Sequence, residues 1–169
     1  MRPIPESYWV EPDRFLAGEY PGSFDLNHAC QKIETFVKSG FNTFIDLTRP
    51  HELIPYESIL KDLAKIYGCD WSYHRFPIRD YDLPTRETMV TILDKIDASL
   101  SANCKVYLHC WGGVGRTGTV IGCYLVRRGF TGEQALAQLA EWWKEMPKRL
   151  HYPRSPETDE QVEFILKWK

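Results

Sequence analysis

The chain reads VYLHCWGGVGRTG from Val106 to Gly118, and this stretch decides its fold. The apolar run from Lys105 to His109 predicts a short buried strand, and the apolar run from Thr117 to Arg128 predicts a helix. Glycines fill the few residues between them. A strand that passes through a glycine-rich loop directly into a helix is typical of α/β proteins, in which ligands gather beyond the carboxyl ends of the strands.

Strands and helices alternate on both sides of this stretch. A hairpin is expected from Tyr8–Val10 and Phe15–Leu16, followed by strands at 41–47, 71–76 and 105–109. Helices are expected at 25–38, 56–67, 85–100, 117–128, 131–146 and from Ser155 to the C-terminus, with Asp25, Thr85, Thr131 and Ser155 as N-caps. The alternation predicts an α/β fold of three layers, α/β/α, with a mainly parallel central sheet and helices on both faces. Since no repeat or linker interrupts it, we expect residues 1–169 to form one domain.

Composition and charge narrow the function classes. The chain has 169 residues, 43% of them hydrophobic, and a formal net charge of -2, which argues against a nucleic-acid-binding protein. Its apolar runs fall far short of the ~20 residues that span a membrane, and Met1 to Pro5 hold no signal-like apolar run. Five cysteines without paired spacing predict free thiols in a reducing compartment, and we expect all but Cys110 to be buried. We therefore expect a cytoplasmic monomer without membrane or nucleic-acid partners.

The loop after the strand has the composition of an anion-binding site. Gly112, Gly113 and Gly115 allow successive backbone N–H groups to turn inward, and the following helix adds the positive end of its dipole. Arg116 can donate to two phosphate oxygens at once. The same positive charges stabilise a thiolate, so we expect Cys110 to be largely ionised at neutral pH.

These residues resemble the signature of the protein tyrosine and dual-specificity phosphatases, HCxxGxxRTG, which runs here from His109 to Gly118. The similarity extends from Leu16-Ala17-Gly18-Glu19-Tyr20-Pro21 to the C-terminal helix, and is greatest to the small branch that includes the kinase-associated phosphatase. The resemblance implies a tyrosine-phosphatase-like fold and a phosphocysteine on Cys110. It assigns the phosphate-binding amides to Trp111, Gly112, Gly113, Val114, Gly115 and Arg116. It further implies that Thr117 stabilises the departing thiolate and that His109 is a buried residue that orients the loop.

A general acid must protonate the leaving oxygen, and the loop from Pro77 to Pro84 offers Asp80 and Asp82. In the family the acid lies some thirty residues before the cysteine. Asp80 fits that spacing and follows Phe76-Pro77-Ile78, so it is the first choice and Asp82 the alternative. Either carboxylate could instead be a solvated loop residue or a helix cap.

The segment from Glu157 to Phe164 resembles the one that positions hydrolytic water in tyrosine phosphatases. Its first glutamine is replaced by Glu157, and Gln161 is the residue that matches. Two interpretations of Gln161 stay open. One is a water-positioning residue, and the other is an exposed helix residue.

The phosphate-binding loop has no charged side chain between Cys110 and Arg116, which favours a substrate with a single phosphate group. Tyr81, Trp111 and Tyr152 could supply aromatic faces for phosphotyrosine. Arginines beside the loops could attract acidic peptides or simply lie on the surface; these are Arg49, Arg79, Arg86 and Arg154.

We therefore expect a protein phosphatase that acts on phosphotyrosine in phosphoproteins, without metal or cofactor. Whether phosphoserine and phosphothreonine are also substrates depends on the depth of the cleft. The histidines lack the spacing of metal ligands. Two alternatives are a phosphatase for inositol phosphates or other small phosphoesters, and a catalytically silent module that binds phosphate groups.

Overall fold

A computed structural model describes all residues, 1–169. A five-stranded sheet lies at its centre, in the order β1-β2-β5-β3-β4. The strands are β1 (Ser7–Glu11), β2 (Phe15–Gly18), β3 (Thr43–Asp46), β4 (Ser72–Arg75) and β5 (Val106–His109). The β1–β2 hairpin is antiparallel, whereas β2, β5, β3 and β4 run parallel to one another. The predicted three-layer α/β architecture is confirmed, with β5 in the middle of the sheet.

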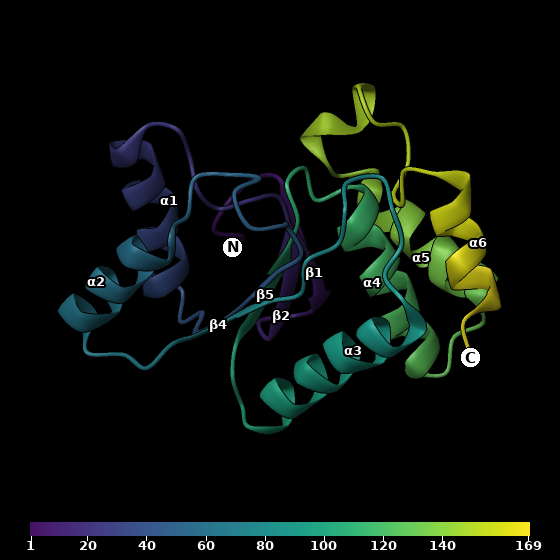
Figure 1. Cartoon of the computed structure of the whole chain (residues 1–169), viewed down its shortest axis with the longest axis horizontal. Coiled ribbons are helices and arrows are strands. Elements are labelled where there is room, and N and C mark those ends of the chain that lie inside the picture. The colour runs from purple at the N-terminus through teal and green to yellow at the C-terminus, as the bar shows by residue number, and fades with distance from the viewer.

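Helices cover both faces of this sheet. The helices are α1 (Leu26–Lys38), α2 (Glu57–Tyr67), α3 (Arg86–Ser101), α4 (Gly115–Arg127), α5 (Gly132–Trp143) and α6 (Asp159–Lys167), with a 3-10 turn at Pro147–Leu150. In Figure 1, α1 and α2 lie on one side of the sheet and α3 to α6 on the other. No helix is long and apolar enough to cross a membrane.

The sheet has a separate hydrophobic core on each face, because side chains along each strand point alternately to one face and to the other. Leu16, Phe44 and Tyr107 point to the core beneath α1 and α2, where Phe36 packs against Tyr107. Their strand neighbours point to the larger core shared with α3, α4, α5 and α6; among them are Phe15, Ala17, Ile45, Val106 and Leu108. Because side chains alternate across a strand, each short strand contributes to both cores and is fixed in register by them.

The expected N-caps are confirmed for three helices. The side chain of Asp25 accepts a hydrogen bond from the backbone N–H of His28, and Thr85 accepts one from Thr88. Thr131 and Gln134 form the reciprocal capping box at the start of α5. These contacts are local in sequence, which is why the pattern of residues alone predicts them.

The expected start of the last helix is wrong. Ser155 does not cap it, because its hydroxyl donates to the carbonyl of Val114, 2.7 Å away and buried. The helix begins at Asp159 instead, where Thr158 and Gln161 form a second capping box. The chain therefore uses Ser155 to hold the loop after β5.

The expected burial of the four other cysteines is also largely wrong. Cys123 is buried in α4, but Cys69 is exposed and Cys30 and Cys104 are only half-buried. Cys69 follows Gly68, the left-handed C-cap of α2, and so lies in a surface turn. The Cys69 side chain is exposed because this surface turn does not pack against either hydrophobic core.

Candidate active site

The loop after β5 forms a cradle, defined here as residues 110–116. It follows His109 at the carboxyl end of the central strand and enters α4 at Gly115, two residues before the expected start of that helix. Cys110 is at the base of the cradle and only 3% exposed. Strand β5 lies between β2 and β3, so the cysteine is delivered to the middle of the sheet edge.

Three carbonyl groups of the cradle are held from outside. The Trp111 carbonyl accepts from the N–H of Tyr20 at 2.8 Å. The Gly112 carbonyl accepts from the Lys148 ammonium at 2.7 Å, and the Val114 carbonyl accepts from Ser155. In a planar trans peptide the next N–H points the opposite way. The N–H groups of residues 112, 113 and 115 therefore turn away from these partners and toward the interior of the cradle.

Gly113 is the residue that permits the tightest approach. Its φ is +73°, and a Cβ there would lie 2.4 Å from the carbonyl carbon of Gly18. The cradle thus rests directly on the backbone at the end of β2. Any side chain at this position would push the two segments apart.

Arg116 is almost wholly buried, at 1% exposure. Its Nη1 and Nη2 donate to the two carboxylate oxygens of Glu52, at 3.0 and 2.7 Å, and Nη1 also donates to the carbonyl of Ile78. Burial alone would raise the pKa of Glu52, but hydrogen bonds from Arg116 and from the backbone of Arg49 outweigh it, so its pKa is lowered. The carboxylate therefore stays ionised and fixes the plane of the guanidinium. Glu52 was not predicted from the sequence, where it is one acid in a polar loop.

Asp80 reaches the same guanidinium. Its Oδ1 lies 2.9 Å from Nη2 of Arg116, and its side chain is 42% exposed. Asp82 points elsewhere, since its carboxylate accepts from the N–H of Leu83 and its carbonyl accepts from Gln161. Of the two expected acids, the structure brings only Asp80 to the cavity that contains Cys110.

A hollow of about 170 Å³ opens above the cradle, and we name it the catalytic cavity because Cys110 lies in its wall. Its lining residues are Asp80, Tyr81, Cys110, Trp111, Gly112, Val114, Gly115, Tyr152 and Glu157. The three expected aromatic side chains all lie there, whereas none of the four arginines does. Arg86 stacks on Trp168 and Arg154 pairs with Asp159, so both are engaged at the surface of other elements.

Glu157 was singled out in the sequence as a departure from the family pattern, and it lines the catalytic cavity. Burial and the neighbouring Asp80 carboxylate raise the pKa of Glu157, and Arg116 opposes this. The cavity thus has two carboxyl groups on one wall and a guanidinium beneath them.

His109 lies beneath the cradle and is fully buried. Its Nδ1 is 3.2 Å from the carbonyl of Cys110, and its Nε2 is 2.7 Å from the hydroxyl of Tyr56. Burial lowers the pKa of His109, which favours the neutral ring. A carbonyl can only accept, so Nδ1 carries the proton and Nε2 accepts from Tyr56. The ring therefore ties the backbone of the cysteine to α2.

Gln161 is buried, so the interpretation as an exposed helix residue is wrong. Its Oε1 accepts from the N–H groups of Glu157 and Thr158, and its Nε2 donates to the carbonyl of Asp82. A Cβ on Gly115 would lie 2.9 Å from that Oε1. Gln161 thus connects the start of α6 to the loop of Asp80 and packs against the cradle.

Thr117 is fully buried, and its hydroxyl has no hydrogen-bond partner. A buried hydroxyl left without a partner typically costs about 1–3 kcal/mol of stability. No group of three or more His, Cys, Asp or Glu side chains is arranged to hold a metal ion.

Comparison with known proteins shows the same family as the sequence motif. Residues 22–130 match the family model "Polymorphic toxin system, DSP-PTPase phosphatase". Among curated relatives, protein tyrosine phosphatase domain-containing protein 1 of Mus musculus is 32% identical over 138 residues, covering 77% of this chain and 18% of the relative. Dual specificity protein phosphatase CDC14B of Mus musculus is 26% identical and is covered over 26% of its length, against 78% of this chain. The chain therefore spans about a quarter or less of these relatives.

Solved structures share the fold. Tk-PTP in its active form superimposes with a TM-score of 0.69 at 24% identity, covering 95% of this chain and 94% of that chain. Kinase associated phosphatase gives 0.70 at 21% identity, with 89% and 83% covered. The catalytic core of the PP-IP phosphatase SIW14 from S. cerevisiae gives 0.64 at 17% identity, with 98% and 88% covered.

Proposed function

The chain belongs to the DSP-PTPase phosphatase family, and from this premise we propose that it is a protein phosphatase that hydrolyses phosphotyrosine through a phosphocysteine on Cys110. The observation that carries the proposal is the catalytic cavity, which brings Cys110 and Asp80 together with three aromatic side chains. In the cradle below them, Arg116 is the one basic residue. Arg116 lies beneath the catalytic cavity and pairs with Asp80.

Phosphate binding uses the cradle and Arg116. The inward N–H groups of residues 112, 113 and 115 donate to the phosphate oxygens, as in other backbone nests for anions. Glu52 keeps the guanidinium of Arg116 in one plane, so that it enters the reaction already oriented. Cys110 at the base then faces phosphorus in line with the leaving oxygen.

Asp80 acts as the general acid. In the protein without substrate, Oδ1 of Asp80 lies 2.9 Å from Nη2 of Arg116. A bound phosphate dianion competes with this carboxylate for the same nitrogen. Because both anions need the same nitrogen, the phosphate displaces Asp80 from Arg116 and leaves its carboxyl group free beside the leaving oxygen. A protonated carboxyl beside the leaving oxygen is what the first step requires.

The reaction then runs in two displacements. The Cys110 thiolate forms an S–P bond as the P–O bond to tyrosine breaks, and the proton of Asp80 passes to the phenoxide oxygen. Water next forms a P–O bond as the S–P bond breaks, and its proton returns to Asp80. The buried Thr117 hydroxyl, which has no partner within the protein, is available to the departing thiolate. Glu157 lines the catalytic cavity that the water enters, and Gln161 acts on it only by accepting from the backbone N–H of Glu157.

The shape of the catalytic cavity supports an aryl phosphate. Tyr81, Trp111 and Tyr152 line it, and aromatic walls favour a flat phenyl ring. Dual specificity, with phosphoserine or phosphothreonine as further substrates, is part of the same proposal. It requires that the phosphate on these shorter side chains can reach the sulfur of Cys110.

A second candidate is hydrolysis of an inositol phosphate, which the fold similarity to the PP-IP phosphatase SIW14 supports. Against it, no lysine or arginine lines the catalytic cavity to meet further phosphates. Charged substrates of that kind need such cations around the reacting group.

The test is a comparison of substrates in the presence of a chelator. Purified protein is assayed on a phosphotyrosine peptide, a phosphoserine peptide and an inositol polyphosphate, beside the Cys110→Ser variant. We expect the phosphotyrosine peptide to give the highest kcat/KM and the variant to give none. A higher kcat/KM on the inositol polyphosphate would replace the proposal by the second candidate.

A further inference from the structure

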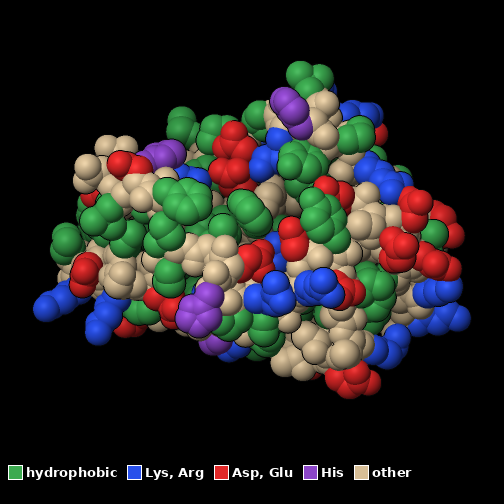
Figure 2. Space-filling model, turned by 45° about the horizontal axis from the view of Figure 1, so that its top comes forward, with side chains coloured by type: hydrophobic (Ala, Val, Ile, Leu, Met, Phe, Trp, Pro, Cys, Tyr) green, Lys and Arg blue, Asp and Glu red, His purple; other side chains and the backbone are tan.

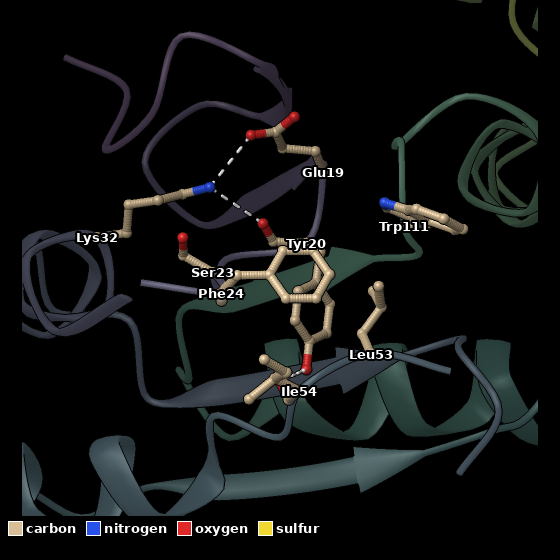
Figure 3. Close-up of a pocket in the computed structure, with 9 residues that line it drawn as sticks. Glu19, Tyr20, Ser23, Phe24, Lys32, Leu53, Ile54 and Trp111 are labelled. Atoms are coloured by element: carbon tan, nitrogen blue, oxygen red, sulfur yellow. Dashed lines mark hydrogen bonds and ion pairs between the residues drawn. The ribbon is translucent and has the colours of Figure 1, made fainter. Parts of the chain in front are cut away.

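A second hollow opens beside the catalytic cavity, and Trp111 belongs to the walls of both. It has a volume of about 220 Å³ and lies between the segment after β2, the first turns of α1 and the loop after β3. Figure 3 shows Tyr20, Leu53 and Ile54 on its floor side and Trp111 at the edge nearest the cradle. We refer to this hollow as the flanking pocket.

The flanking pocket exposes large apolar side chains. Phe24 is 84% exposed, Ile54 48% and Trp111 54%. Figure 2 shows a broad gathering of hydrophobic side chains on this face of the molecule. Clustered exposed apolar residues around a concavity, unlike single ones, mark a place where another apolar group binds.

The polar groups of the flanking pocket are already engaged with one another. The Lys32 ammonium donates to Glu19 and to the carbonyl of Tyr20, both at 3.2 Å (Figure 3). The second oxygen of Glu19 accepts from Lys148 at 2.9 Å. The Tyr20 hydroxyl donates to the carbonyl of Ile54, and Ser23 accepts from the N–H of Asp25.

This arrangement excludes one class of occupant. A second phosphate group would need a cation or several free N–H donors. Lys32 is the one cation that lines the flanking pocket, and it already donates to Glu19 and to the carbonyl of Tyr20. Lys148 shares Glu19 but lies outside the lining and donates to the carbonyl of Gly112. What remains accessible to a ligand is the apolar wall of Phe24, Leu53, Ile54 and Trp111.

We propose that the flanking pocket is a specificity subsite that receives an aromatic or branched aliphatic side chain near the phosphorylated residue of a peptide substrate. The inference rests on the proposed phosphotyrosine phosphatase function and names the substrate class more closely. Its occupant is the substrate itself, because Trp111 lines both the flanking pocket and the catalytic cavity, so that a residue near the phosphorylated one lies within reach of the flanking pocket. A phosphorylated peptide therefore lies across Trp111, with its phosphate on the cradle and its apolar neighbour against Ile54 and Phe24.

The experiment uses a panel of phosphotyrosine peptides. Each carries one leucine or phenylalanine at a different position before or after the phosphotyrosine, and alanine elsewhere; an all-alanine peptide is the reference. We expect kcat/KM at the best position to exceed the reference about tenfold in the wild type, a typical gain for a small apolar pocket. That ratio corresponds to about 1.4 kcal/mol.

The variant Phe24→Ser with Ile54→Ser replaces two of the four apolar side chains of the wall by polar ones, and the ratio should fall toward one. Ile66→Ala is the matched control, since Ile66 is 74% exposed on α2 and lines neither pocket; the tenfold ratio should persist in it. Thermal unfolding checks that each variant is folded.

The outcomes separate the two proposals. If the wild type hydrolyses the reference peptide but shows no preference for an apolar neighbour, the subsite is refuted and the phosphatase function stands. A preference that survives the double serine variant refutes the subsite in the same way. If folded, reduced protein hydrolyses no phosphopeptide, the proposed function fails and the subsite fails with it.

Discussion

Replacing Glu52 by glutamine should destabilise the protein, because it removes the charge opposite a buried guanidinium. Arg116 is 1% exposed and donates to both carboxylate oxygens of Glu52. Breaking a buried pair on one side typically costs about 3–5 kcal/mol. Arg116 keeps Asp80 and the carbonyl of Ile78 as partners, so we expect Glu52→Gln to lower the free energy of unfolding by about 2–3 kcal/mol.

The assay is urea denaturation at neutral pH, with Glu163→Gln as the control. Glu163 pairs with Lys167 on the exposed face of α6, and such surface pairs contribute about 0–1 kcal/mol. A loss in Glu52→Gln no larger than that in the control would refute the account of Arg116 as a residue fixed by Glu52.

The pH dependence of the free energy of unfolding tests the Glu52–Arg116 ion pair in a second way. The pKa of Glu52 is lowered in the folded protein, so its contribution to stability is present above its unfolded pKa and is lost as pH falls through the folded one. The difference between the wild type and Glu52→Gln should therefore be constant near neutral pH. It should shrink as the pH falls below about 4.

Four further variants test the remaining parts of the site. Asp80→Asn should lower kcat on a phosphotyrosine peptide by about 10²- to 10⁴-fold, whereas Asp82→Asn should keep most of the activity; the reverse order, measured by steady-state kinetics, would make Asp82 the acid. Gly113→Ala should cost at least about 2 kcal/mol of stability in urea denaturation, because its φ of +73° and the contact with the Gly18 backbone both resist a side chain, and an unchanged unfolding curve would contradict the close approach. Lys148→Met removes the donor to the Gly112 carbonyl and should lower kcat/KM about tenfold or more, since a hydrogen bond from a charged group contributes about 1.5–3 kcal/mol; equal kcat/KM in the two proteins would deny Lys148 a role in shaping the cradle.

Local patterns explain what could be predicted from the sequence. The strand, glycine-rich loop and helix around Cys110 are contiguous, so their order predicts both the layered fold and the place of the cradle. The caps at Asp25, Thr85 and Thr131 depend on residues three positions apart. The spacing of Asp80 from the cysteine required the family resemblance, because nothing in its own loop distinguishes it from Asp82.

Contacts between distant segments explain what could not be predicted. Glu52 lies 64 positions from Arg116, and Lys148 lies 36 positions from Gly112. Ser155 has the residue type of a helix cap, yet tertiary packing gives its hydroxyl to Val114. Each is an ordinary polar residue in the sequence and acquires a role only when the loops meet at the edge of the sheet.

The central claim is covalent catalysis by Cys110, and trapping the intermediate tests it most directly. Protein mixed with a phosphotyrosine peptide is quenched with acid within the first turnover, digested and examined by mass spectrometry. The account predicts one phosphate group on the peptide that contains Cys110, and none in Cys110→Ser. Turnover in the serine variant, or a phosphate found on another residue, would contradict it.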